Sequence, residues 1–350
     1  MKKFAVIALF FLAAGLLFAA GAKESPEAEG KKEAPRQFVT YGMPHEHVWG
    51  ALFDAFCAKY NLVHVDTDMS SAEAITKFVA EKNKSIAYAT EAGITFGADA
   101  VKREASLAYK NANWGKIPDW AKDANGNWFA IYGGVPTFLV NPAAVKNVPR
   151  SWKDLLKDEY KKTLAIKDPR TSGTALSAVL GVNSAMGGDL SSLKAGVMFF
   201  KQMKQQGNLS PASPSDSNVQ KGEIPVTVKY DHENLILRNA LKAELKLEIV
   251  VPEDGTMYTP SVVILNRWAP NQDLAKALAD FITSDEGQLL VAKGLARPIR
   301  YLAGNLQVPD DIKANWLPDD AYKGKVKIAK DWDKFSQADF VDLWTKEVAP

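Results

Sequence analysis

The chain has 350 residues, with 43 basic and 41 acidic side chains and a single cysteine. This near balance, without a run of charge of one sign, makes nucleic acid and acidic membrane surfaces poor partners. Cys57 has no second cysteine to pair with, so the fold must rest on its hydrophobic core alone. The length exceeds what one core usually holds, which predicts two lobes.

The start of the chain predicts export. The basic Met1–Lys3 precedes the apolar run Phe4–Ala20, and Ala20-Gly21-Ala22 has the small residues of a cleavage site. We therefore predict a signal peptide over residues 1–22 and a periplasmic or extracellular protein. A retained membrane anchor is the alternative, although the apolar run is marginal for a span. Residues 23–36, rich in Lys, Glu, Pro and Ala, predict a flexible linker.

Strand and helix patterns alternate along the rest of the chain. This alternation predicts an α/β fold with two mixed, mostly parallel sheets and flanking helices. Ligands of such sheets bind beyond the carboxyl ends of the strands. We expect strands at 37–41, 62–65, 86–89, 128–132, 136–141, 163–166, 225–230, 247–251 and 261–265. We expect helices at 48–60, 71–83, from 151, from 176, and at 191–206, 271–293 and 337–348.

The second block of strands looks inserted into the first. Two crossings, near 135–141 and near 258–265, join the blocks and predict a hinge of two strands. The expected lobes are residues 37–137 with 260–350, and residues 138–259. This arrangement predicts a cleft between them.

A turn rich in hydroxyl residues, Asp168–Thr174, lies between the strand at 163–166 and a helical pattern. Such a turn presents unpaired backbone N–H groups and the positive end of a helix dipole. Gly173 lets a ligand approach the backbone, and Thr171, Ser172 and Thr174 add hydroxyl donors. The turn predicts a cradle for a phosphate or carboxylate. An ordinary helix N-cap is the alternative.

In their order along the chain, several short motifs resemble bacterial extracellular solute-binding proteins of ABC importers. The resemblance is to the type II periplasmic-binding branch, which includes ferric-iron, polyamine, thiamine and phosphorylated-sugar binders. It implies a two-lobed clamshell, a monomer, that delivers a small molecule to a permease in the inner membrane. The motifs are 41–44 (YGMP), 148–156 (VPRSWKDLL), 168–174 (DPRTSGT), 222–231 (GEIPVTVKYD), 251–255 (VPEDG), 269–271 (APN), 284–288 (SDEGQ) and 297–300 (RPIR).

Loops at the predicted cleft supply the candidate ligand contacts. In the cluster Asp231-His232-Glu233, carboxylates and an imidazole suit sugar hydroxyls or an amine. Together with the cradle, this cluster predicts a small, polar, anionic solute such as a phosphorylated sugar. The candidate ligand-binding residues are Met43, His45, His47, Trp49, Asp68, Ser70, Ser71, Thr171, Ser172, Gly173, Thr174, Tyr230, Asp231, His232 and Tyr258. We expect Asp231→Ala to weaken binding without unfolding the protein.

Other ligands and activities stay open at this point. A ferric ion with a synergistic anion would use His45, His47, Tyr230 and Asp231, but the resemblance implies two adjacent tyrosines where this chain has one. A polyamine would use the acids and leave the cradle idle.

A secreted hydrolase is the least favoured alternative. The sequence contains no G-x-S-x-G, H-E-x-x-H or P-loop motif. Asp231 directly precedes His232, which is poor geometry for a triad with Ser172. We predict that the protein binds no cofactor and is not an enzyme.

Overall fold

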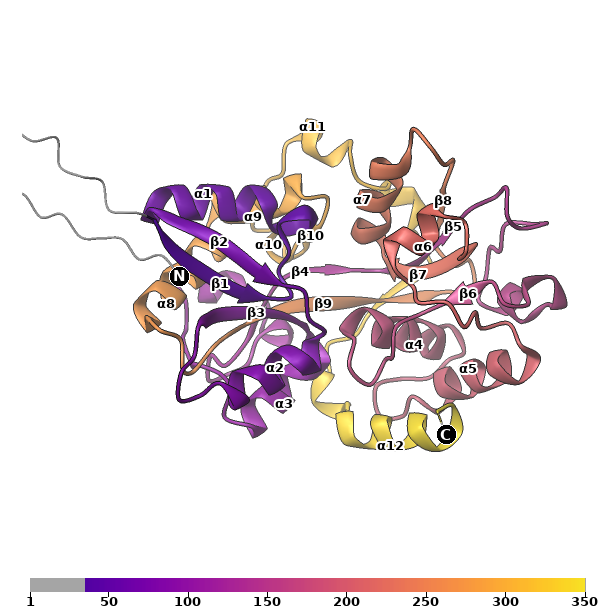
Figure 1. Cartoon of the computed structure of the whole chain (residues 1–350), viewed down its shortest axis with the longest axis horizontal. Helices are drawn as coiled ribbons and strands as arrows, with labels where there is room; N and C mark the ends of the chain where they lie inside the picture. Colours follow the sequence, from indigo (N-terminus) through magenta and orange to yellow (C-terminus); the bar gives the residue numbers. More distant parts are fainter. Residues whose placement is uncertain (1–34, 350) are drawn as a thin grey trace, which may run out of the picture. The chain divides into compact units, whose positions relative to one another are not determined.

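The computed structural model describes residues 35–349 (Figure 1). The predicted signal peptide lies outside these residues, and so does the predicted linker except for Pro35 and Arg36. Arg36 already begins the first strand. Within the described range, no helix is both long and apolar enough to cross a membrane.

The larger sheet of the described chain contains seven strands. They are β1 (Arg36–Tyr41), β2 (Leu62–Thr67), β3 (Ala87–Gly93), β4 (Phe129–Gly134), β9 (Thr256–Leu265), β10 (Arg297–Pro298) and β11 (Val326–Ile328). Their order is β10-β4-β9-β3-β1-β2, with β11 paired to the start of β9. β1 runs parallel to β2 and β3, whereas β9 is antiparallel to β3 and β4. The sheet is therefore mixed.

Helices pack on this sheet and bury its central strands. They are α1 (Gly50–Tyr60), α2 (Ser71–Ala80), α3 (Gly97–Lys102), α8 (Gln272–Thr283), α9 (Asp285–Lys293) and α10 (Ile299–Leu302), followed by α11 (Asp310–Lys313). Figure 1 shows α1 and α9 on one side of the strands, with α2 and α3 on the other. Because both faces are covered, β4 and β9 are buried along their whole length.

The smaller sheet has four strands in the order β6-β7-β5-β8. These are β5 (Pro136–Val140), β6 (Leu164–Ala165), β7 (Val226–Tyr230) and β8 (Glu248–Val250). The accompanying helices are α4 (Gly173–Ala185), α5 (Lys194–Gln206), α6 (Asp216–Gln220), α7 (Asp231–Leu241) and α12 (Gln337–Glu347). Each sheet forms the centre of one lobe. Helices α4 and α7 of the second lobe both begin at the side that faces the first lobe.

Two extended segments join the lobes. β4 passes through Val135 directly into β5, and β9 runs beside β4 through the middle of Figure 1. The division into 37–137 with 260–350 and 138–259 stays a prediction. The C-terminal segment favours a different assignment of the tail, because α12 packs on α5, and Lys201 pairs with Glu347 at 2.7 Å.

Several elements differ from their predicted form. The single helix expected over 271–293 is two helices, because the Ser284 hydroxyl accepts the Gly287 N–H at 3.0 Å and starts α9 afresh. The strand expected at 86–89 continues to Gly93, so Glu91 lies in a strand and not in a loop. The segment expected as a helix from 151 forms only a short 3-10 turn, Lys153–Leu156.

Glycines in β4 make room for two tyrosine rings at the crossing. A Cβ atom on Gly133 would lie 2.3 Å from Cζ and Oη of Tyr258, and one on Gly134 would lie 2.5 Å from the ring of Tyr230. Both tyrosines are buried. The crossing therefore requires residues without a side chain at these two positions.

We predict that Gly133→Ala lowers the free energy of unfolding by about 2 kcal/mol or more, because the added methyl group overpacks a buried ring. Urea unfolding would measure the change. Gly115→Ala is the control, since nothing lies within 4 Å of a Cβ atom placed there. Equal stability of the two variants would show that the Tyr258 ring can move aside.

His64 is a packing residue that also fixes a turn of the first lobe. Its ring stacks on Phe53 with 3.7 Å between centroids. Its Nε2 lies 2.8 Å from the Thr40 hydroxyl, which donates to Asp66 at 2.7 Å. The same Asp66 oxygen accepts the N–H of Met43 at 2.9 Å. This chain of hydrogen bonds holds the turn after β1 in place.

Burial lowers the pKa of His64 to about 4, with a smaller contribution from His45. The folded protein therefore holds a neutral ring where the unfolded chain takes up a proton near pH 6.5. We predict that this group's contribution is complete above pH 6.5 and is lost as the pH falls towards 4, on the order of 2 kcal/mol. His64→Phe should flatten the stability profile over that window in urea titrations. An unchanged slope would contradict this.

Candidate functional site

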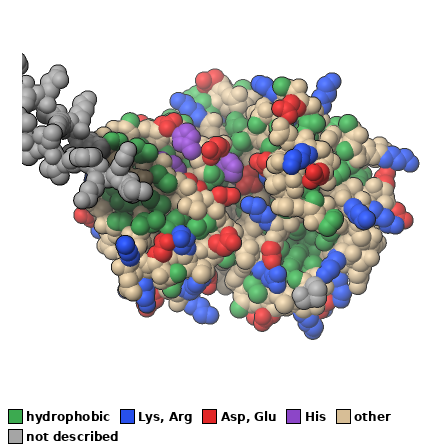
Figure 2. Space-filling view, viewed as in Figure 1, with side chains coloured by type: hydrophobic (Ala, Val, Ile, Leu, Met, Phe, Trp, Pro, Cys, Tyr) green, Lys and Arg blue, Asp and Glu red, His purple; other side chains and the backbone are tan. Residues whose placement is uncertain are grey.

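A cavity opens between the two lobes, and we call it the cleft cavity. It holds about 680 Å³ of space not filled by protein, part of it open to solvent, which matches the size of small-molecule sites. Figure 2 shows histidine and acidic side chains around this hollow. The lining residues are Gly42, His47, Val48, Asp68, Met69, Ser70, Ser71, Glu91, Ala92, Gly93, Tyr132, Lys167, Ser172, Gly173, Thr174, Tyr230, His232, Glu233 and Ser261.

Two helices, one from each lobe, begin side by side at this cavity. The N–H of Ala72 in α2 donates to the carbonyl of Thr171, just before α4, at 3.2 Å. A Cβ atom on Gly173 would lie 3.0 Å from the Gly93 nitrogen and 3.1 Å from the Ser71 hydroxyl. The lobes therefore touch backbone to backbone, which the absence of a side chain at Gly93 and Gly173 permits.

Both helix starts follow from local sequence. The Ser172 hydroxyl accepts the N–H of Ala175 at 3.3 Å and caps α4. Glu73 accepts the N–H and the hydroxyl of Ser70 at 2.9 and 2.6 Å, as the capping-box spacing predicts. The first-turn N–H groups of a helix have no partner within the helix. Those of Ala72, Glu73 and Ala175 donate to other groups here, which leaves Ser71, Gly173 and Thr174 among the described residues of the two first turns. Together with the helix dipoles, these groups make this wall of the cavity favourable for an anion.

The wall from β3, β4 and β9 carries a carboxyl group. Glu91 Oε2 accepts the indole N–H of Trp49 at 2.7 Å. Burial raises the pKa of Glu91, and hydrogen bonds from Tyr132, Trp49 and Ser261 oppose this rise only in part. Glu91 therefore offers a ligand a hydrogen-bond acceptor that the protein has already oriented.

At the crossing, Asp231 holds the backbone between β4 and β5. Its carboxylate accepts the Val135 N–H at 3.1 Å, and its own N–H donates to the Val135 carbonyl at 2.9 Å. The Tyr322 hydroxyl donates to its other oxygen at 2.5 Å. Burial alone would raise the pKa of Asp231, but contacts with His232, Tyr322 and the Val135 N–H lower it. Asp231 is thus part of the hinge.

The neighbouring His232 reaches the cleft cavity. Its Nδ1 lies 3.5 Å from the Asp231 carboxylate. Burial acts to lower the pKa of His232, whereas Asp231, Glu233 and Glu91 raise it, and the acids prevail. His232 therefore adds positive charge to the cavity more readily than an ordinary histidine would. Among the described residues that line the cavity, Lys167 carries the one permanent positive charge, against Asp68, Glu91 and Glu233.

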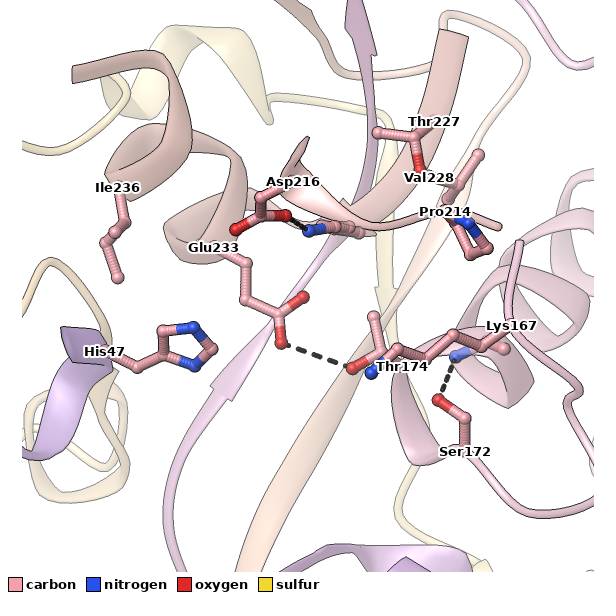
Figure 3. Close-up of a pocket in the computed structure, with 12 residues that line it drawn as sticks. His47, Lys167, Ser172, Thr174, Pro214, Asp216, Thr227, Val228, Glu233 and Ile236 are labelled. Atoms are coloured by element: carbon pink, nitrogen blue, oxygen red, sulfur yellow. Dashed lines mark hydrogen bonds and ion pairs between the residues drawn. The ribbon is translucent and has the colours of Figure 1, made fainter. Parts of the chain in front are cut away.

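Glu233 connects α7 to α4. Its Oε1 accepts the Thr174 hydroxyl at 3.3 Å, and its Oε2 accepts the Tyr230 N–H at 3.4 Å. Figure 3 shows His47, from the first lobe, on the other side of this carboxylate. His47, Thr174 and Glu233 therefore surround one point of the cleft. His47 comes from the first lobe, and the other two come from the second.

The structure places nine of the fifteen predicted contacts on the cavity wall. These are His47, Asp68, Ser70, Ser71, Ser172, Gly173, Thr174, Tyr230 and His232. The assignment of these residues to a ligand remains a prediction.

The other six lie outside the lining. Met43 and Trp49 are fully buried, the first bonded to Asp66 and the second to Glu91. His45 faces Asp54 at 2.9 Å, and Tyr258 lies against Gly133. The remaining two are Thr171, on the outer side of the turn, and Asp231, at the hinge.

Sequence reasoning missed several lining residues. Glu91 was hidden because it occupies a strand among small residues, where an acid suggests a solvent-facing position. Lys167 directly follows the strand pattern before the cradle, so its place at the carboxyl end of β6 was a usable signal. Tyr132 and Ser261 reach the cavity through strand pairing, which no local pattern indicates.

The alternative metal ligands are not brought together. In the part of the chain that the structure describes, no group of three or more His, Cys, Asp or Glu side chains is arranged to hold a metal ion. His45 is engaged by Asp54, and Asp231 by Val135 and Tyr322.

Comparison with known proteins agrees with this architecture. The family model described as bacterial extracellular solute-binding protein matches residues 81–325. The chain belongs to the bacterial extracellular solute-binding proteins. Its structural neighbours include periplasmic binding proteins, and the family that the order of motifs indicated is confirmed.

Individual relatives of this solute-binding protein vary in their described ligands. An uncharacterized protein of Haemophilus influenzae is 28% identical over 91% of this chain and 92% of its own. A Salmonella typhimurium protein named "Putative 2-aminoethylphosphonate-binding periplasmic protein" is 26% identical over 49% of this chain and 51% of its own. The periplasmic binding protein AfuA of Actinobacillus pleuropneumoniae, solved with fructose-6-phosphate, is 23% identical with a TM-score of 0.73, over 90% and 98% of the chains.

We now predict that Asp231→Ala destabilises the protein, in contrast to the expectation from sequence. The substitution leaves the buried Val135 N–H without its acceptor and removes the partner of Tyr322, a loss of about 2–4 kcal/mol. Urea unfolding would measure it. Asp231→Asn keeps an acceptor for Val135 and should lose less. If Asp231→Ala unfolds within about 0.5 kcal/mol of the unmodified protein, the hinge role is wrong.

Proposed function

We propose that this protein captures a small, polar, anionic solute, such as a phosphorylated sugar, in the cleft cavity and delivers it to a cognate ABC permease. On this proposal it works outside the cytoplasm as a monomer, without a cofactor, and performs no catalysis. The observation that carries the proposal is the meeting of two helix N-termini, α2 and α4, at one wall of the cavity.

The positive ends of these helices suit an oxyanion. Backbone N–H groups, the hydroxyls of Ser71 and Ser172, and the ammonium group of Lys167 all belong to this side of the cavity. Phosphate or phosphonate oxygens accept several such donors at once. The Salmonella relative is named for a phosphonate, which agrees with this chemistry.

The acidic groups restrict what the rest of the solute can be. Asp68, Glu91 and Glu233 accept hydrogen bonds and repel a second anionic group. The solute therefore carries hydroxyl or amino groups away from its anionic end. A sugar phosphate meets both conditions.

A polyamine is the second candidate, favoured by the excess of carboxylates over fixed positive charges in the lining. Its amino groups would pair with these acids. It would leave the two helix N-termini without a partner, which is why we rank it lower.

Closure follows from the position of the site. A ligand held by α2 and β3 on one side and by α4 and α7 on the other gains its full contacts only when the lobes meet. The contact of Gly93 with Gly173 marks how closely they approach. Binding should therefore be sensitive to any group inserted there.

Isothermal titration calorimetry with glucose 6-phosphate, glucose and spermidine tests the proposal. We expect glucose 6-phosphate to bind, and glucose to bind at least a hundredfold more weakly, because it lacks the anion. Spermidine binding with no response to glucose 6-phosphate would overturn the proposal in favour of the polyamine.

In the same titrations, Gly173→Ala should weaken glucose 6-phosphate binding about tenfold or more, because its methyl group would stand against Gly93 and Ser71. Its stability without ligand should change by less than about 1 kcal/mol, since alanine suits a helix. Gly115→Ala is the control and should bind normally. Unchanged affinity in Gly173→Ala would show that the lobes do not need this contact.

A further inference from the structure

A second cavity continues from the cleft cavity into the second lobe, and we call it the annex. It holds about 580 Å³ of unfilled space. The two cavities share five lining residues: His47, Lys167, Ser172, Thr174 and Glu233. The annex extends beyond them along β7, α7 and the segment before α6 (Figure 3).

Of the charged groups around the annex, Lys167 lies at its border with the cleft cavity, and the others beyond it already have partners. Lys229 pairs with Asp216, and Glu233 accepts the Thr174 hydroxyl at 3.3 Å. A solute entering the annex finds these groups engaged with one another. It would gain little by offering them a charge of its own.

The remaining surface of the annex is largely apolar. Ala175, Pro214, Val228 and Ile236 contribute to its lining, and Val228 is 3% exposed. Pro214 and Ile236 are half-buried and lack a covering side chain on the annex side. An apolar group placed here would be removed from water by the protein.

The boundary between the cavities is polar. Thr174 and Glu233 form it with a hydrogen bond that is long for an interaction with a carboxylate. Figure 3 shows this pair between the His47 side and the Pro214 and Val228 side. A solute whose polar head lies in the cleft cavity can therefore send a substituent past this pair.

We infer that the annex is a subsite for a small uncharged apolar substituent, so that the captured solute is an oxyanion that carries an alkyl or aryl group in addition to its hydroxyl or amino groups. This inference rests on the proposed function, because the oxyanion must first be held at α2 and α4. It goes further because it names the chemical class of the part of the solute that extends from the cleft cavity into the annex.

The inference is tested by calorimetry with three phosphonates of increasing size: methylphosphonate, propylphosphonate and phenylphosphonate. Burial of one methylene group strengthens binding about fourfold. We expect propylphosphonate to bind about tenfold more tightly than methylphosphonate, and phenylphosphonate at least as tightly as propylphosphonate. Methylphosphonate is too short to reach the annex and serves as the reference.

Ile236→Trp, which fills the annex, should remove this dependence on size. The control is Ile249→Trp. Ile249 is also half-buried in the second lobe, and it does not belong to the described residues that line the two cavities. The control should keep the tenfold gain. If Ile236→Trp folds poorly, Ile236→Ala replaces it in the test. Loss of the isoleucine side chain should reduce the affinity gain of propylphosphonate over methylphosphonate about threefold.

The outcomes separate the two proposals. Equal affinities of the three phosphonates in the unmodified protein, or a gain that persists in Ile236→Trp, would overturn the annex. Binding of glucose 6-phosphate without binding of any phosphonate would do the same and leave the proposed function intact. Absence of binding by glucose 6-phosphate and by all three phosphonates would overturn both.

Discussion

The buried carboxylate of Asp231 holds the chain where it passes from one lobe to the other. It accepts the N–H of Val135 between β4 and β5, and its own N–H returns a hydrogen bond to the same residue. The hydroxyl of Tyr322, in the C-terminal segment, donates a hydrogen bond to the other carboxylate oxygen. The position of α7 depends on this arrangement, and with it the placement of His232 and Glu233 at the cleft cavity. The hinge and the site are therefore one structure, in which a residue at the crossing orients residues that face the ligand.

The opposite wall depends on close contact between backbones. Gly93 and Gly173 let β3 and α4 approach so nearly that the starts of α2 and α4 share a hydrogen bond. The first-turn N–H groups that remain, those of Ser71 in α2 and of Gly173 and Thr174 in α4, act together with the two helix dipoles and concentrate positive potential at one point between the lobes. Glu91 on the strand wall, and Glu233 beside the start of α4 where it accepts the Thr174 hydroxyl, favour solutes that also donate hydrogen bonds. Charge alone would not select such a solute, but the combination of donors and acceptors around the cavity does.

The two-lobed fold and the hydroxyl-rich turn at 168–174 could be predicted from sequence, because strand patterns and helix caps are local signals. The break at Ser284 could not, since apolar periodicity continues across it while the cap depends on geometry. Trp49 looked like a ligand contact because it follows the histidine turn. Its indole instead donates to Glu91, a pairing that arises only when β3 lies beside the first helix. Glu91 was missed for the same reason. Asp231 was predicted as a ligand contact, and its bonds to Val135 and Tyr322 at the crossing could not be read from the sequence.

The central claim is that the cleft captures an anionic organic solute. The most direct measurement is native mass spectrometry, with elemental analysis, of protein incubated with the small-molecule fraction of a bacterial lysate and re-isolated by gel filtration. The account predicts one bound organic molecule per chain and close to one equivalent of phosphorus. Stoichiometric iron, a bound polyamine mass, or protein that retains nothing would contradict it.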